Sequence, residues 1–159
     1  MKKSGLAASF ALAAAFILSG CVAQHAAVAP HPARIGIQMQ NGVYAGISPD
    51  THKPFYTTPA DAPETYTWSE GTAYCSALDA SGHKGWRVPT QGELNVEFNN
   101  RASIGGFNLS GSYNAGWYWS SSPSFGSNAW AQRFIDGYQG SSRRDSRFVP
   151  ALCAGMSLG

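Results

Sequence analysis

The stretch Gly116-Trp117-Tyr118-Trp119-Ser120-Ser121-Ser122 decides the fold of this 159-residue chain. Three adjacent large aromatic side chains beside small polar ones are typical of a core strand that leads into a displayed surface, because aromatic residues favour strands and bury large areas. A stretch rich in serine, glycine and arginine follows and ends near Arg147. We therefore expect a rigid framework at the aromatic run and a polar surface after it.

The chain begins with a segment that we exclude from the folded domain. Lys2 and Lys3 precede the apolar run Leu6–Leu18, which has the length of a signal peptide and is too short to span a membrane. The run closes on Leu18-Ser19-Gly20-Cys21, which resembles the bacterial lipobox, where the cysteine is acylated and becomes the mature N-terminus. We expect a lipoprotein signal peptide at 1–20 and a lipid anchor on Cys21. An ordinary secretory signal with an incidental cysteine is the alternative.

Residues 21–40 are expected to form a flexible tether from the lipidated Cys21. From Val22 to about Gln40 the chain is rich in Ala, Pro, Val, Gln and His, and it has no sustained period and no aromatic residue. Val22, in place of an aspartate, favours the outer membrane by resemblance to enteric sorting rules. We expect a surface-exposed outer-membrane lipoprotein of the bacterial cell envelope, with one folded domain at 41–159.

The charge balance limits the class of partner. The whole chain has 11 basic and 9 acidic side chains. Two of the basic ones, Lys2 and Lys3, are removed with the signal, so the mature form would have nine basic and nine acidic side chains. This neutrality removes the general electrostatic argument for nucleic acid binding. A membrane contact through the lipid anchor is expected instead.

Two cysteines remain if Cys21 carries the lipid. Cys75 and Cys153 form a pair in a chain exported to an oxidising compartment, where disulfides persist. A Cys75–Cys153 disulfide is the natural inference, and it would close a loop that spans most of the domain. Two buried free thiols are the alternative, because sequence does not show whether the two Cα atoms lie within bonding range.

Two helices are expected early in the domain. Thr67-Trp68-Ser69-Glu70 has the pattern of a capping box, and in the helix that it opens Cys75 and Leu78 share a buried face with the tryptophan. Gly82 supplies the expected stop. A second box, Thr90-Gln91-Gly92-Glu93, follows Pro89 and opens a shorter helix.

The rest of the domain carries strand and turn signals. Asn41-Gly42 and Ser48-Pro49-Asp50 are turn signals around short apolar runs, and they predict a β-hairpin over 41–58. Short strands are expected at 116–120, 129–135 and 148–153. The predicted fold class is therefore α+β, with two helices early and a small antiparallel β-sheet later.

Rare tryptophans and their neighbours occur in a fixed order along the domain: Trp68, Cys75, Gly85-Trp86-Arg87-Val88-Pro89-Thr90 with Glu93-Leu94, Trp117-Tyr118-Trp119-Ser120-Ser121, Ala129-Trp130 and Phe134–Gly137. In this order they resemble the Lcl C-terminal domain family over roughly residues 42–153, which implies a C-type-lectin-like fold. The family tends to close on Arg-Cys-Val-Arg. Here Arg147-Phe148-Val149-Pro150 occupies that place, and Cys153 comes later.

More narrowly, the chain resembles family members that serve as variable proteins of diversity-generating retroelements, some of them surface lipoproteins. Adenine mutagenesis in those systems converts AAC-type asparagine codons into many others, but not into codons for Lys, Glu, Gln, Met or Trp. Two segments, 120–128 and 140–154, contain none of these five residue types. A serine- and glycine-rich lectin-fold loop with ordinary drift is the alternative.

The resemblance implies a membrane-anchored protein that binds a ligand, an unknown protein or glycan at a cell surface, through a variable C-terminal loop surface. Aromatic and arginine side chains give large contact areas there, while serine adapts its hydrogen bonds. The candidate contacts are Ser124, Phe125, Ser127, Asn128, Asp136, Tyr138, Ser141, Ser142, Arg143, Arg144 and Asp145. Trp117, Trp119, Trp130 and Phe134 are expected to be core and frame.

Other functions have weaker support. Asp136 and Asp145 lie in no recognisable catalytic motif, so no catalytic residue is assigned and an enzyme is not expected. Formylglycine-generating enzymes share the wider fold but need a reactive cysteine pair. The Glu-Pro-Asn and Gln-Pro-Asp triplets of calcium-dependent lectins are missing, so we expect no required metal and no cofactor. A structural envelope lipoprotein without a specific ligand is the main alternative.

Overall fold

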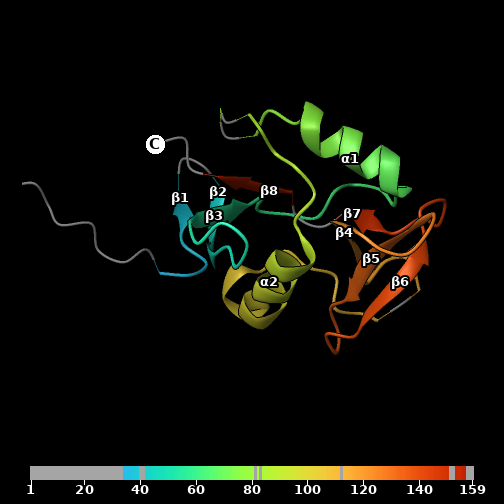
Figure 1. The fold of residues 1–159 in the computed structure, drawn as a ribbon. Coiled ribbons are helices and arrows are strands. Elements are labelled where there is room, and N and C mark those ends of the chain that lie inside the picture. The colour runs from blue at the N-terminus through green and yellow to red at the C-terminus, as the bar shows by residue number, and fades with distance from the viewer. Residues whose placement is uncertain are drawn as a thin grey trace, which may run out of the picture. The chain divides into compact units, whose positions relative to one another are not determined.

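The structure is a computed structural model that describes residues 34–39, 42–80, 82, 84–111, 113–150 and 153–156 (Figure 1). The chain divides into two units, 1–31 and 32–159, and all described residues lie in the second. The predicted signal peptide, Cys21 and most of the predicted tether therefore lie outside the described residues. Within the described part, no helix is long and apolar enough to cross a membrane.

The described strands form two four-stranded sheets, one that contains the predicted hairpin and one that contains the predicted later strands. The first sheet has the order β1-β2-β3-β8, with every pair antiparallel: β1 (Gln38–Met39), β2 (Gly42–Ile47), β3 (Pro54–Thr57) and β8 (Ala154–Met156). The second has the order β6-β5-β4-β7: β4 (Trp117–Pro123), β5 (Asn128–Arg133), β6 (Gln139–Arg143) and β7 (Val149–Pro150). Its β4 and β7 pair in parallel, and its other pairs are antiparallel.

The C-terminal strand β8 belongs to the first sheet although it follows the second sheet in sequence. The hairpin predicted over 41–58 is confirmed as β2 and β3, but β8 returns from the far end of the sequence and pairs with β3. This pairing joins residues about a hundred positions apart, such as Phe55 and Met156. A local turn signal cannot reveal such a partner, because strand pairing of this kind depends on tertiary contacts.

Both predicted capping boxes are present. The Thr67 backbone N–H donates to Glu70 Oε2 at 2.8 Å, and the Thr90 N–H donates to Glu93 Oε2 at 2.9 Å, while each threonine side chain accepts from the glutamate N–H. They open α1 (Trp68–Ala77) and α2 (Gln91–Ile104). The α+β class is therefore confirmed, with both helices before the second sheet.

The helix lengths differ from the predictions. Helix α1 ends at Ala77 and not near Gly82, because Leu78 is extended and packs against the disulfide cluster. Helix α2 has 14 residues against 10 in α1, so the expectation of a shorter second helix is wrong. Its last residue, Ile104, is buried in one cluster with Val43 and Phe55, and Gly105, with φ +74°, caps the helix directly after it.

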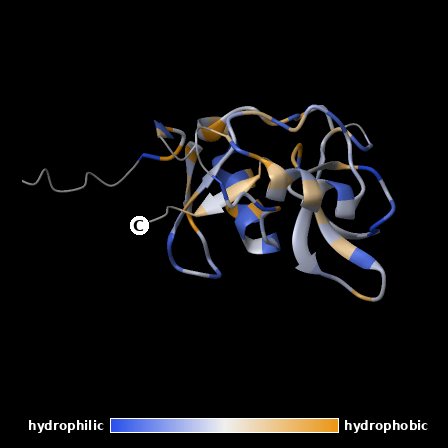
Figure 2. Ribbon diagram, turned by 90° about the horizontal axis from the view of Figure 1, so that it is seen from above, coloured by the Kyte–Doolittle hydropathy of each residue, from blue (hydrophilic) through white to orange (hydrophobic). Residues whose placement is uncertain are grey.

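The predicted disulfide is confirmed at the centre of the core. Cys75 and Cys153 are bonded, with Cα atoms 5.6 Å apart, and are 0% and 1% exposed. They pack in one cluster with Trp86, Trp119 and Phe148. Figure 2 shows hydrophobic residues interspersed with hydrophilic ones along the ribbon. Large aromatic residues from separate segments, rather than one long apolar run, therefore supply this core.

A buried acid lies between α2 and the first sheet. Glu97 has 0% exposure, and burial raises its pKa well above the usual glutamate range. Glu93, one turn earlier on α2, raises the pKa of Glu97 further, whereas the Thr57 hydroxyl opposes the shift. The folded domain therefore favours the protonated form of Glu97, because water cannot solvate the ionised carboxylate there.

We predict that stability falls as pH rises because of Glu97. A pKa that is higher in the folded state gives a contribution that is complete below the usual glutamate pKa and is lost as pH rises through the folded value. Urea unfolding of the wild type and Glu97→Gln between pH 5 and 9 measures it. The variant should lose less stability with rising pH, while Glu64→Gln, an exposed control, should follow the wild type. Equal pH slopes for wild type and Glu97→Gln would contradict the prediction.

Candidate functional site

Nine of the eleven predicted contact residues gather at one end of the second sheet. They come from the β4–β5 turn, the first residue of β5, and the end of β6 with the turn after it: Ser124, Phe125, Ser127, Asn128, Ser141, Ser142, Arg143, Arg144 and Asp145. The register that pairs Asn128 with Arg143 brings the segments together. We call residues 124–128 and 141–145 the distal surface.

Strand β6 was not predicted, and it changes what kind of surface this is. Five register pairs hold β6 to β5, so Ser141, Ser142 and Arg143 lie on a strand and not on a loop. The serine- and glycine-rich sequence of β6 has low strand propensity, so pairing with β5 and not local preference makes the strand. The distal surface is therefore an edge strand flanked by two turns (Figure 1).

Direct hydrogen bonds connect the parts of the distal surface. The Ser124 and Ser141 hydroxyl oxygens are 2.8 Å apart, which ties the β4–β5 turn to β6. The Arg144 backbone N–H donates to the Ser127 carbonyl at 3.1 Å. These bonds hold three stretches of sequence in fixed relation, so their side chains can act on one ligand.

An open hollow of about 250 Å³ lies in the distal surface between Ser127, Arg143, Arg144 and Asp145. Arg143 donates to Asp145 through Nε at 3.1 Å and Nη2 at 2.6 Å. This contact holds the pKa of Asp145 below its usual range. The two side chains are 77% and 64% exposed, so solvent screens the pair and a ligand can reach both charges.

Phe125 stands at the tip of the β4–β5 turn with 95% of its surface exposed. Gly126, with φ +60°, gives the turn the left-handed conformation that glycine adopts without strain. A phenyl ring in water contributes nothing to folding, whereas the same ring in an interface would bury a large apolar area. Phe125 is thus free to contact a partner.

Arg144 has a different environment from its neighbour Arg143. Its guanidinium carbon lies 4.5 Å from the centre of the Trp68 ring, and its Nε donates to the Asn128 carbonyl at 3.2 Å. The Trp68 backbone N–H in turn donates to the Arg144 carbonyl at 3.0 Å. Arg144 therefore holds the first residue of α1 against the second sheet, in addition to lining the hollow.

The structure does not bring Asp136 and Tyr138 to the distal surface. Both lie in the β5–β6 turn, and the length of β5 places that turn roughly 16 Å away at the usual rise per residue. Asp136 accepts two hydrogen bonds from Arg133, at 2.9 and 2.5 Å. The Tyr138 ring packs edge-to-face on Trp117 with centroids 5.9 Å apart. These two predicted residues belong to a separate aromatic corner.

The expected frame residues are mostly in the core. Trp119 and Phe134 are 0% exposed, and Trp117 stacks on Phe148 with centroids 5.7 Å apart. Trp130 differs, since it is only half-buried and belongs to none of the core clusters among the described residues. The prediction that it is purely structural missed this exposure, because sequence alone does not show which face of a strand is covered.

A partly buried amide network supports β6, and sequence reasoning missed it. Gln91 on α2 donates to the Gln139 side-chain carbonyl at 2.9 Å, and Gln139 donates to the Gln132 carbonyl at 3.2 Å. Gln132 donates to Asn95 on α2 at 3.4 Å. The only signal in the sequence is that glutamines flank the β5–β6 turn. The network links the edge strand to a helix, so the distal surface rests on a fixed support.

The predicted cysteine pair is structural in this arrangement. A buried disulfide in the aromatic core is not the accessible reactive pair that a formylglycine-generating-like enzyme would need. Among the described residues, no group of three or more His, Cys, Asp or Glu side chains could hold a metal ion.

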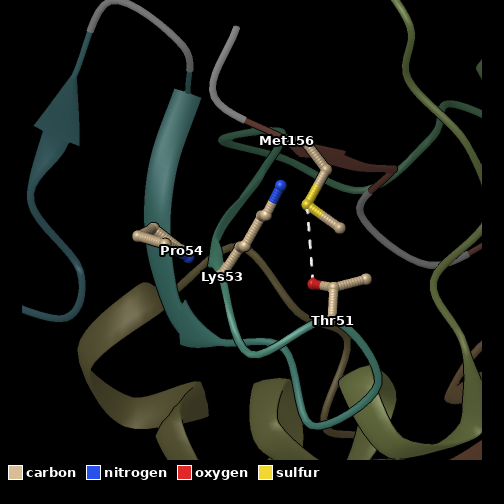
Figure 3. Close-up of a pocket in the computed structure, with 4 residues that line it drawn as sticks. All are labelled: Thr51, Lys53, Pro54 and Met156. Carbon is tan, nitrogen blue, oxygen red and sulfur yellow. Dashed lines mark hydrogen bonds between the residues drawn. The ribbon is translucent and has the colours of Figure 1, made fainter. Parts of the chain in front are cut away.

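A second hollow of about 270 Å³ lies beside the first sheet, between Thr51, Lys53, Pro54 and Met156 (Figure 3). The Thr51 hydroxyl points to the Met156 sulfur at 4.0 Å across it. None of the predicted contact residues lines this hollow. The distal surface, where nine of the predicted contact residues lie, therefore remains the candidate site.

We predict that the two neighbouring arginines differ in their effect on stability. Arg144→Ala removes a cation–π contact and a hydrogen bond, which together contribute about 1–2 kcal/mol, and should lower Tm by about 3–8 °C. Arg143→Ala removes only an exposed pair and should leave Tm nearly unchanged. Calorimetry of both variants measures this, and equal losses would show that Arg144 is not a positioning residue.

Comparison with known proteins identifies the family of the domain. The model of the Lcl C-terminal domain matches residues 43–152. No curated protein matches the chain. The matched segment contains both helices and all strands of the second sheet, and it covers more than half of the 159 residues. The chain belongs to the Lcl C-terminal domain family.

Proposed function

We propose that this protein is a lipid-anchored protein of the bacterial cell envelope that binds a protein or glycan ligand through its distal surface. The observation that carries the proposal is the convergence of nine predicted contact residues on one end of one sheet, around an open hollow. Exposed aromatic and arginine side chains beside adaptable hydroxyls are the composition of recognition surfaces.

A variable surface is supported by the separation of buried framework residues from exposed residues of the distal surface. Between the two segments that lack Lys, Glu, Gln, Met and Trp lie Ala129, Ala131, Gln132 and Phe134, which are at most 1% exposed. Substitutions there would disrupt packing, whereas exposed positions of the distal surface tolerate change. Of the segment 140–154, only the first part is displayed, because Phe148 and Cys153 are in the core.

We further propose that a retroelement diversifies the distal surface. The genome should then contain an adenine-rich imperfect copy of the segment that encodes residues 116–159, beside a reverse transcriptase gene. Sequencing of the locus decides this. Without such a copy the diversification proposal fails, although ligand binding by a fixed surface would stand.

The membrane anchor is proposed from the lipobox-like Leu18-Ser19-Gly20-Cys21. Metabolic labelling with a fatty acid should mark the wild type and not Cys21→Ala, because acylation needs the thiol. Val22→Ala is a matched control that keeps the thiol and should still be labelled. Labelling of Cys21→Ala would contradict the proposed anchor.

We predict that Phe125→Ala and Arg143→Ala weaken ligand binding at least about tenfold while Tm stays nearly unchanged. The ligand can be isolated by cross-linking the full-length protein on cells to envelope and surface components. Tyr113→Ala, which removes another exposed aromatic ring (72% exposed, against 95% for Phe125) outside the distal surface, is the control. If both distal variants bind like the wild type, the protein has another binding surface or is a structural envelope lipoprotein.

A further inference from the structure

One face of the second sheet changes from covered to open along β5 and β6. Directly paired residues point to the same face, so Gln132 and Gln139, Trp130 and Ser141, and Asn128 and Arg143 follow one another along it. Helix α2 covers the first pair, through Gln91 and Asn95. Ser141 and Arg143 are exposed, so the face opens where the helix begins.

Trp130 lies at this boundary without the contacts that fix other tryptophans. The Trp68 indole N–H donates to the Ser120 carbonyl at 2.9 Å, and that of Trp119 donates to the Tyr66 carbonyl at 3.0 Å. Among the described residues, Trp130 has neither such a bond nor a ring partner. An indole that is half-buried offers a flat apolar surface and a free donor, which is an unusual use of the largest side chain on an otherwise polar face.

The polar groups around Trp130 are neutral or balanced in charge. Ser141 lies directly across the ladder, with Cβ atoms at about 5 Å by ordinary sheet geometry, and its hydroxyl meets that of Ser124. Asn128 and Gln132 are the neighbours of Trp130 on the same strand face. Arg143 is already paired with Asp145. Hydroxyls and amides both donate and accept hydrogen bonds, as the hydroxyls of a sugar do.

We propose that the ring of Trp130 is the stacking platform for one pyranose unit of a neutral saccharide, whose hydroxyls bond to Ser124, Asn128 and Ser141. A pyranose has a C–H face that matches the indole and a rim of hydroxyls that matches the surrounding groups. Arg143, the charged residue on this face of β6, is already paired with Asp145 and so offers a charged sugar no free counter-charge. This inference rests on the proposed function, because it names the ligand class of the distal surface.

The position of Trp130 in the sequence gives the site a fixed centre. It lies between the segments 120–128 and 140–154, whereas Ser124, Asn128 and Ser141 lie inside them. A change in the surrounding residues would thus alter which sugar is preferred, while the stacking contact remains.

The test uses the full-length protein and a panel of neutral sugars: glucose, galactose, mannose and N-acetylglucosamine, with their oligosaccharides. The indole N–H resonance of Trp130 is assigned by its loss in Trp130→Phe and followed by NMR during titration. We expect a saturable shift with at least one sugar. Trp130→Ala should weaken that binding at least about tenfold, Trp130→Phe about threefold or less, and Ser141→Ala to an intermediate degree.

Two outcomes would overturn the inference. One is that no sugar of the panel shifts the Trp130 resonance, and the other is that Trp130→Ala binds the sugar as well as the wild type does. Tyr113→Ala controls for the loss of any exposed aromatic ring. If the sugar test fails but Phe125→Ala and Arg143→Ala weaken binding to a cross-linked protein ligand, the sugar site is wrong and the proposed function stands. If the sugar test fails and neither of these variants changes ligand binding, both the sugar site and the proposed function are wrong.

Discussion

The ion pair between Arg87 and Glu93 holds the corner on which the rest of the domain depends. Glu93 is fully buried and accepts two hydrogen bonds from the Arg87 guanidinium, both at 2.7 Å, and one from the Thr90 N–H. Burial alone would raise the pKa of Glu93, but these bonds outweigh it and hold the pKa below its usual range. The pair thus fixes a charged group in the interior and caps α2 with the same carboxylate. Removal of either partner would strand a charge, which is costly in a low-dielectric interior.

The same corner joins the two sheets. Arg87 exchanges two backbone hydrogen bonds with Ala154 of β8, at 2.9 and 2.7 Å. Two residues later the Pro89 carbonyl accepts from the Ser121 N–H of β4 at 2.8 Å. A short segment therefore contacts an edge of the first sheet and a strand of the second, while the disulfide fixes α1 to the residue just before β8. Within the distal surface Arg144 supports this framework, whereas Phe125 and Arg143 are exposed and lie outside it.

Local signals gave correct predictions where the chemistry itself is local. A capping box needs only residues within one turn, and Thr67 and Thr90 both cap as their spacing indicates. The disulfide followed from cysteine number and expected compartment. The end of α2 also has a local signal, Gly105 with φ +74°, which the prediction of a shorter helix did not use. Strand β6 was missed because its serines and glycine adopt a strand only beside β5. The eleven candidate contacts were close to each other in sequence, but the length of β5 separates Asp136 and Tyr138 from the other nine.

By itself the sequence determined the α+β class, the two helix starts, the cysteine pair, the family and the stretch that carries the candidate site. These depend on residue types at short spacing, which a linear chain displays in full. Only the tertiary structure decided that β8 completes the first sheet, that Arg144 supports α1 while Arg143 is exposed and paired with Asp145, and that Trp130 is partly open to solvent. Each of these depends on which face of an element another element covers, and that is set by packing between segments far apart in the chain.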